Sequence, residues 1–105
     1  MAQFTVYKNK NPRTKSIFPL LLDVQTGLLS DLHSRAVVPL TKSPAALQKP
    51  VSRLTPIIKV EGASHLLVTY QLAAISQSAL GLAVADASEN RAAIIAALDL
   101  LLTGI

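Results

Sequence analysis

The chain has 105 residues, of which 50% are hydrophobic and 15% are charged. This composition excludes a disordered chain, and the length suits one domain with a modest hydrophobic core. There is no cysteine, which excludes disulfides and cysteine-based zinc sites as sources of stability. We therefore predict a single domain over residues 1–105, stabilised by its core with or without a dimer interface.

The net charge of +4 is distributed unevenly along the chain. Residues 1–59 contain nine Lys and Arg against two aspartates, whereas residues 60–105 contain one arginine against four carboxylates. This asymmetry favours an acidic partner, either nucleic acid or an acidic polypeptide. Only four aromatic residues are present, too few for a base-stacking platform. The sequence therefore favours a protein partner.

The N-terminal segment lacks the features of a secretory signal, because residues 1–7 have neither a basic region nor an apolar run. The apolar stretch over residues 92–102 is interrupted by Asp99 and is shorter than the roughly 20 residues that a bilayer requires. We expect a soluble protein with no membrane partner. The absence of cysteine is compatible with a cytoplasmic location.

Five segments have the pattern of β-strands. They cover residues 3–7, 17–25, 35–40, 56–60 and 65–70, the last with an apolar continuation to residue 75. Pro19 predicts an edge or a bulge near the start of the second strand. Residues 79–84 fit either a short strand or a turn.

The connections between these segments differ in character. Residues 8–16 form a polar, basic loop, and residues 26–34 form a connection in which Gly27 permits a tight turn. Residues 41–55 contain Pro44 and Pro50 and are the least regular part, with one short helical turn expected around residues 45–48. Residues 61–64 predict a hairpin turn.

The segment from Arg91 to Gly104 predicts an α-helix at the C-terminal end. Asp86 and Glu89 have the spacing of a capping box, with Ser88 as a competing N-cap. Gly104 stands where a left-handed residue ends a helix. Several mostly antiparallel strands closed by one helix predict an α+β fold or a small barrel.

The predicted helix has two unequal sides. The bulky side consists of Ile94, Ile95, Leu98, Leu101 and Leu102. The opposite arc consists of Ala92, Ala93, Ala96, Ala97, Asp99, Leu100 and Thr103. We expect the bulky side to face the sheet and the alanine-rich arc to face a partner.

Four pieces of the chain occur in an order typical of one family. They are Gln3-Phe-Thr-Val-Tyr7, Asp23-Val-Gln25, Val37-Val-Pro-Leu40 and the closing helix with its Gly104-Ile105 end. Together they resemble the CcdB toxin family of bacterial toxin–antitoxin modules, nearly from end to end. The resemblance implies an SH3-like barrel of the CcdB/MazF type, with about five antiparallel strands and a C-terminal helix.

The same resemblance implies the partners. Family members are homodimers that bind the A subunit of DNA gyrase and trap the enzyme on cleaved DNA, and a CcdA-like antitoxin neutralises them. Carried over by position, the gyrase-binding surface comprises Leu28, Leu29, Asp99, Leu102, Thr103, Gly104 and Ile105. For Leu28 and Leu29, packing in the core or in a dimer is an equally good interpretation.

Two positions depart from the family pattern. Thr103 stands where the best-known members have tryptophan, and Asp99 stands where they have asparagine. A tryptophan buries about 150–250 Å² and can stack on an arginine, neither of which threonine does. The departures imply weaker gyrase binding, a different gyrase, contacts spread over other residues, or a folded homologue that no longer poisons gyrase.

The basic residues supply weaker candidates for antitoxin binding: Lys8, Arg13 and Arg91. Charge-assisted hydrogen bonds from the basic loop would suit an acidic antitoxin tail, although such loops are usually only solvated. Arg91 lies in the first turn of the predicted helix, the unfavourable end for a cation. A carboxylate such as Asp86, or one from the antitoxin, is therefore expected beside it.

The residues do not form a recognisable catalytic or metal-binding pattern. His33 and His65 are far apart in sequence, and no spacing suggests further ligands. We interpret Asp23 as a strand residue bonded to neighbouring backbone and Asp31 as a loop carboxylate, rather than as an acid–base pair. Phosphate-binding loops and nucleophile elbows are absent from the sequence. We expect a non-catalytic inhibitor without cofactor or metal.

The alternative class is an enzyme, an endoribonuclease of the MazF type, because the two toxin families share a fold and fold alone does not decide function. Such an enzyme needs a cation at the phosphate and a nearby general base. Arg13, Arg35 and His33 are its candidates.

Overall fold

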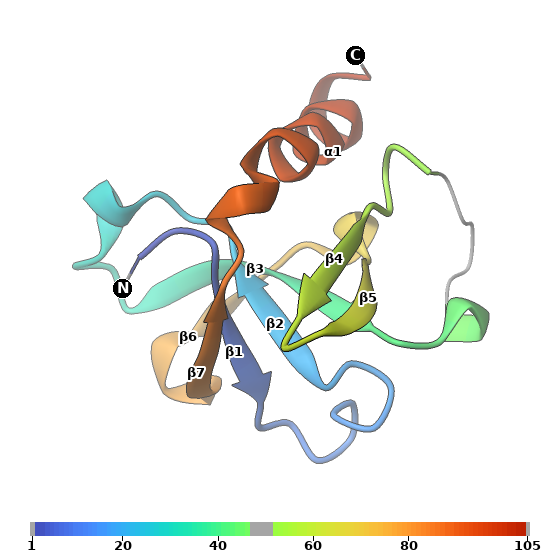
Figure 1. Ribbon diagram of the computed structural model, residues 1–105. Helices are drawn as coiled ribbons and strands as arrows, with labels where there is room; N and C mark the ends of the chain where they lie inside the picture. The colour runs from blue at the N-terminus through green and yellow to red at the C-terminus, as the bar shows by residue number, and fades with distance from the viewer. Residues whose placement is uncertain (1, 47–51, 105) are drawn as a thin grey trace.

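The computed structural model describes residues 2–46 and 52–104, in which the chain forms one curled sheet and one α-helix (Figure 1). The strands are β1 (Thr5–Asn9), β2 (Leu20–Asp23), β3 (Ser34–Thr41), β4 (Ile57–Val60), β5 (Ala63–Leu67), β6 (Ala73–Ser76) and β7 (Leu80–Asp86), followed by α1 (Arg91–Thr103). All pairs are antiparallel, in the order β4-β5-β3-β2-β1-β7, with β6 paired to β3. The predicted α+β class is confirmed, with seven strands in the described residues instead of about five.

Strand β3 organises the sheet because it pairs with three others. Residues 37–40 pair with β2, residues 34–37 pair with β6, and residues 40–41 pair with β5. Most of β3 is buried, as expected for a strand covered on both faces. The prediction of a strand at residues 35–40 is confirmed.

Two hydrophobic clusters lie on the two faces of this sheet. The larger contains Val6, Leu22 and Val38 together with Ile94 of α1, and the smaller contains Tyr7, Leu21 and Val37. Adjacent residues of β1, β2 and β3 divide between the clusters, because successive side chains of a strand point to opposite faces. The larger cluster therefore lies on the face of the sheet that α1 covers.

The structure corrects several predicted boundaries. The expected strand over residues 65–70 ends at Leu67, and a 3₁₀ turn, η3 (Thr69–Gln71), separates it from β6. The apolar run of residues 65–75 gave no sign of this break, which arises because residues 73–76 pair with the first half of β3. The first strand begins at Thr5 and the second at Leu20, later than predicted.

The remaining connections follow the predicted pattern in part. Residues 80–86 form a strand and not a turn. The predicted helical turn at residues 45–48 corresponds to a 3₁₀ turn at Pro44–Ala46. The last two residues of the predicted segment, 47 and 48, lie outside the described residues. The predicted hairpin turn is confirmed: Val60 pairs with Ala63, and Glu61 and Gly62 have φ of 51° and 80°. Positive φ at both central residues defines a type I′ turn.

Gly81 allows β7 to approach β1 closely. A Cβ atom at this position would lie 2.8 Å from the backbone oxygen of Lys8. We expect Gly81→Ala to lower the free energy of unfolding by about 1–3 kcal/mol, because the contact is with backbone and β1 must shift. Urea unfolding measures this, with the exposed neighbour Ala83→Ser as the control. Unchanged stability of Gly81→Ala would contradict the close approach.

Helix α1 packs on the sheet through a narrower face than predicted. Ile94 and Ala97 are fully buried, whereas Leu102 is 69% exposed. Two expectations are therefore wrong: Ala97 does not belong to the exposed arc, and Leu102 does not face the sheet. The helix extends away from the sheet toward its C-terminal end, so its last turn lies beyond the core (Figure 1). Among the described residues, no helix has the length and apolar character that a bilayer crossing requires.

The two ends of α1 differ in how well the sequence predicted them. The prediction of a capping box formed by Asp86 and Glu89 is wrong, because Asn90 occupies the N-cap of α1 without a side-chain hydrogen bond. Asp86 Oδ1 instead accepts a hydrogen bond from the Ser88 amide at 2.9 Å, at the start of a preceding 3₁₀ turn (Ser88–Asn90). The predicted C-terminal stop is confirmed: Gly104 has φ of 76° and donates its N–H to the Leu100 carbonyl at 3.0 Å.

Candidate functional site

The connection between β2 and β3 presents leucine side chains to solvent. We call residues 26–32 the leucine loop; Leu28 is 91% exposed, and Leu29 and Leu32 are each 48% exposed. A 3₁₀ turn, η1 (Gly27–Leu29), shapes the loop and contains no buried residue. Packing of Leu28 and Leu29 in the protein's own core is thereby ruled out. Exposed apolar side chains gathered on one loop are typical of a binding surface.

The C-terminal end of α1 forms a second exposed surface. Asp99, Leu102, Thr103 and Gly104 are all exposed. The Thr103 hydroxyl donates to the Asp99 carbonyl at 2.7 Å, so its O–H donor is used within the helix. Among the described residues of this surface, the apolar contribution comes mainly from Leu102. Ile105 lies outside the described residues, and its predicted role stays a prediction.

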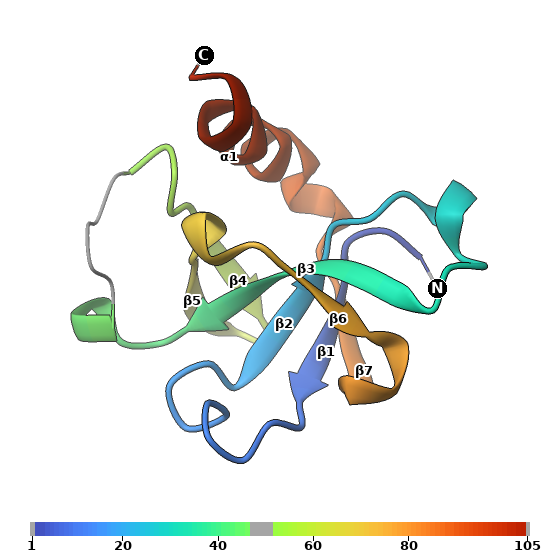
Figure 2. The same ribbon diagram turned by 180° about the vertical axis from the view of Figure 1, so that it is seen from behind.

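Within one copy of the chain, the leucine loop and the helix end are not adjacent. Figures 1 and 2 show the loop on one side of the sheet, near the start of α1, whereas the free end of α1 points away from it. The predicted gyrase-binding residues thus form two separate surfaces. A single partner that uses both must span the length of the helix or meet two copies of the chain.

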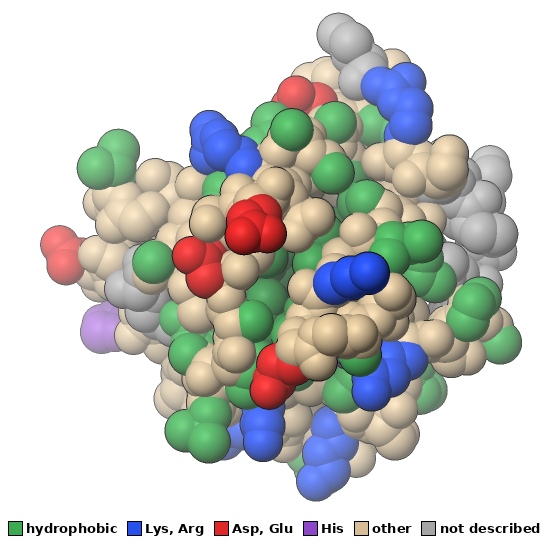
Figure 3. Space-filling model, viewed as in Figure 1, with side chains coloured by type: hydrophobic (Ala, Val, Ile, Leu, Met, Phe, Trp, Pro, Cys, Tyr) green, Lys and Arg blue, Asp and Glu red, His purple; other side chains and the backbone are tan. Residues whose placement is uncertain are grey.

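The basic loop between β1 and β2 is ordered by its asparagines. Asn9 Nδ2 donates to Thr14 Oγ1 at 3.0 Å and to the Phe18 carbonyl at 2.8 Å, and Asn11 Oδ1 accepts from the Arg13 amide at 2.9 Å. Lys8 and Arg13 are exposed. In Figure 3, basic side chains line the end of the sheet where this loop lies, and acidic side chains cover the connection from β7 to α1.

Arg91 lies apart from that loop, at the start of α1. Its guanidinium carbon is 5.6 Å from the centre of the Phe4 ring, a cation–π geometry. The expectation of a carboxylate beside Arg91 is therefore wrong within the described chain, where the neighbour is an aromatic ring. Phe4 itself is buried and has φ of 69°, a strained conformation for a residue other than glycine. Lys8, Arg13 and Arg91 do not form one patch.

The most buried charged residues form an ion pair that sequence reasoning missed. Arg35 and Asp23 are both fully buried, with Arg35 Nη2 2.8 Å and Nε 2.9 Å from Asp23 Oδ2. Arg35 therefore has no access to a phosphate, and its assignment as a ribonuclease residue is wrong. A signal was available: a lone carboxylate in the apolar segment Leu20–Asp23 needs a buried cation.

The other candidates for chemistry are dispersed. Arg13 lies in the basic loop, His33 is exposed at the end of the leucine loop, and Asp31 is an exposed loop carboxylate. His65 is buried, with Nδ1 2.9 Å from the Ala63 carbonyl oxygen. Asp23 Oδ1 accepts from the Gln25 amide at 3.0 Å, which confirms the predicted bond to neighbouring backbone. Among the described residues, no group of three His, Asp or Glu side chains could hold a metal ion.

A hollow of about 460 Å³ lies between the basic loop and the sheet. Its floor is apolar, formed by Leu21, Val37 and Ile75, and its rim includes Asn9 and Lys10. The lining contains no carboxylate or histidine, so it holds neither a general acid nor a general base of those types. This hollow therefore suits binding better than acid–base chemistry.

The architecture and these surfaces define the class: a small α+β protein with a curled antiparallel sheet, one C-terminal helix and exposed apolar surfaces on a loop and on the helix end. Residues 3–104 match the family model described as CcdB protein. The chain therefore belongs to the CcdB family, and the resemblance drawn from its sequence is confirmed. Membership places it among the toxins of toxin–antitoxin systems.

Proposed function

We propose that this toxin acts on the A subunit of DNA gyrase and traps the enzyme on cleaved DNA, by binding and without catalysis of its own. The exposure of Leu28 and Leu102 carries the proposal, because these residues occupy positions implicated in gyrase binding by the family resemblance. Trapping requires that the toxin bind the cleaved form of gyrase more tightly than the intact form. Such a mechanism needs surface complementarity only, and it operates in the cytoplasm where gyrase acts.

A homodimer fits the separation of the two surfaces. One copy presents the leucine loop and the helix end on different sides (Figure 2). Two copies related by symmetry present each surface twice, which lets one gyrase dimer meet equivalent contacts. Dimerisation would also cover part of the apolar area that a single copy leaves exposed.

Exposed Leu102 helps to explain how the helix end can act without the tryptophan seen in other family members. Its side chain is 69% exposed one residue before Thr103. The threonine hydroxyl is bonded to the Asp99 carbonyl, so the methyl group is left for contact with a partner. We propose that Leu102 and the leucine loop supply the apolar contact here.

Neutralisation by a CcdA-like antitoxin is the second part of the proposal. Exposed Lys8 in β1 and exposed Arg13 in the adjoining basic loop lie on a scaffold fixed by asparagine hydrogen bonds, which suits an acidic segment. Arg91 lies at the other end of the sheet, so an antitoxin segment that reaches it would have to extend along the molecule (Figure 1). The ribonuclease alternative is weakened, because Arg35 is buried and paired.

A plasmid supercoiling assay tests the proposal. In a reaction with matched gyrase and ATP, we expect the toxin to cause linear plasmid to accumulate, because the cleaved complex persists. The linear plasmid is detected after protein denaturation. The control is the same reaction with gyrase omitted, which separates poisoning from nuclease activity. Unchanged supercoiling at micromolar toxin would contradict gyrase poisoning, and linear product without gyrase would indicate a nuclease.

A further inference from the structure

The leucine loop is held in place by hydrogen bonds instead of by packing. None of the residues of η1 is buried, and Leu28, Leu29 and Leu32 all project into solvent. Local hydrogen bonds within the loop shape it: Thr26 Oγ1 accepts from the Leu28 amide at 3.3 Å, and the Ser30 amide donates to the Gly27 carbonyl at 3.2 Å. These bonds fix the turn itself but not its position on the sheet.

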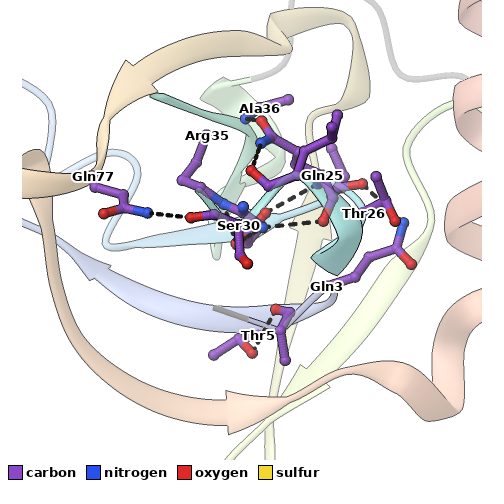
Figure 4. A network of polar contacts seen from close by, with 12 residues as sticks. Gln3, Thr5, Gln25, Thr26, Ser30, Arg35, Ala36 and Gln77 are labelled. Carbon is purple, nitrogen blue, oxygen red and sulfur yellow. Dashed lines mark hydrogen bonds and ion pairs between the residues drawn. The ribbon is translucent and has the colours of Figure 1, made fainter. Parts of the chain in front are cut away.

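Gln25 connects the loop to the sheet through four hydrogen bonds (Figure 4). Its side-chain Nε2 donates to the Leu29 carbonyl at 3.2 Å, and its Oε1 accepts from the Ala36 amide of β3 at 3.0 Å. Its backbone amide donates to Asp23 Oδ1 at 3.0 Å, and its carbonyl accepts from Arg35 Nη2 at 3.1 Å. One residue thus joins the loop, the neighbouring strand and the buried ion pair.

A second glutamine holds the loop from its other side. Gln77 Nε2 lies 3.4 Å from the Ser30 carbonyl and 3.3 Å from the Leu32 carbonyl, and the Gln77 amide donates to the His33 carbonyl at 2.8 Å. Gln77 follows β6, which pairs with β3. Its two side-chain bonds, at 3.3 and 3.4 Å, are somewhat longer than the two side-chain bonds of Gln25, at 3.0 and 3.2 Å.

The buried ion pair fixes the position of Gln25. A buried pair is weak evidence for stability, because desolvation offsets much of the attraction. This pair also leaves Arg35 Nη1 buried without a hydrogen-bond partner among the described residues. What the pair does provide is directional: the two residues together bond the amide and the carbonyl of Gln25.

We infer that Gln25 is the positioning residue of the gyrase-binding leucine loop, held by the Asp23–Arg35 pair and assisted by Gln77. The inference rests on the proposed function for the identity of the binding partner, gyrase. The part of the inference that concerns the position of the loop does not depend on that function. Gln25 does not need to touch gyrase in this role. It determines where Leu28 and Leu29 stand before the partner arrives, which lowers the ordering cost of binding.

Gln25→Glu tests this inference, because glutamate keeps the acceptor for the Ala36 amide and replaces the donor to the Leu29 carbonyl with a repelling oxygen. We expect about a tenfold loss of affinity for the gyrase A subunit. We also expect faster hydrogen exchange at the Leu29 and Ser30 amides, measured by NMR without gyrase, and an unfolding midpoint close to that of the wild type. Gln71→Glu, an exposed glutamine in η3 away from the loop, is the matched control.

A double-mutant cycle separates positioning from a general structural effect. If Gln25 acts through the loop, Gln25→Glu adds little further loss of affinity once Leu28→Ala has removed the contact. Fully additive losses, or unchanged exchange at Leu29 and Ser30, would overturn the inference. If the wild-type protein does not bind gyrase, the proposed function fails, and the exchange measurement still decides whether Gln25 holds the loop.

Discussion

Replacing Arg35 with methionine is expected to lower the free energy of unfolding by about 3–5 kcal/mol, because Asp23 then remains buried as an unpaired charge. The Gln25 carbonyl loses its donor in the same variant. Domains of this size have free energies of unfolding of about 5–15 kcal/mol, so the expected loss is a large share of the total stability. Urea unfolding followed by circular dichroism measures the change.

Two comparisons make this prediction specific. Arg13→Met removes an exposed arginine and is expected to change stability by less than about 0.5 kcal/mol. The double variant Asp23→Leu/Arg35→Met is expected to be more stable than Arg35→Met alone, because no charge is left unpaired. Equal stabilities of wild type and Arg35→Met would show that the pair does not form. Because Arg35 is buried, loss of activity in its variants does not by itself indicate catalysis.

Removing Thr103, Gly104 and Ile105 is expected to abolish accumulation of cleaved plasmid while the protein stays folded. The core contacts of α1 come from residues 94–98, more than a turn before Thr103, and both Thr103 and Gly104 are exposed. The described helix loses the hydrogen bond from the Gly104 amide to the Leu100 carbonyl and the bond from the Thr103 hydroxyl to the Asp99 carbonyl, both in its last turn. The gyrase cleavage assay measures the effect, and circular dichroism and the oligomeric state establish that the fold persists.

A point substitution gives the same test without shortening the chain. Leu102→Asp is expected to weaken gyrase binding by about thirtyfold or more, the loss typical of an interface hot spot at about 2 kcal/mol. Leu82→Asp on β7 is the matched control, because Leu82 is 72% exposed and Leu102 is 69% exposed. Comparable losses in both variants would indicate a general surface effect. Full activity of the truncated protein would show that Thr103, Gly104 and Ile105 are not part of the contact.

The candidate site could be predicted only in part. The family motifs named the leucines of the loop and the residues of the helix end, and the structure shows Leu28, Leu29 and Leu102 exposed. The interpretation of Arg35 was wrong, because sequence does not show that its side chain lies beside Asp23 within the sheet. The roles of Gln25 and Gln77 were equally hidden, since their partners are mostly backbone carbonyls and amides brought near by strand pairing.

The side-chain pattern predicts the local elements of this protein, and its motifs predict the family. Strand β3, the hairpin at Glu61-Gly62, and the stop of α1 at Gly104 follow from side-chain pattern and from backbone angles that few residues tolerate. Tertiary contacts account for the break between β5 and β6, the face that α1 buries and the pairing of Asp23 with Arg35. Each of these features depends on which segments of the chain lie next to one another in the folded sheet. That arrangement is set by the sheet as a whole, because its contacts join residues remote in sequence.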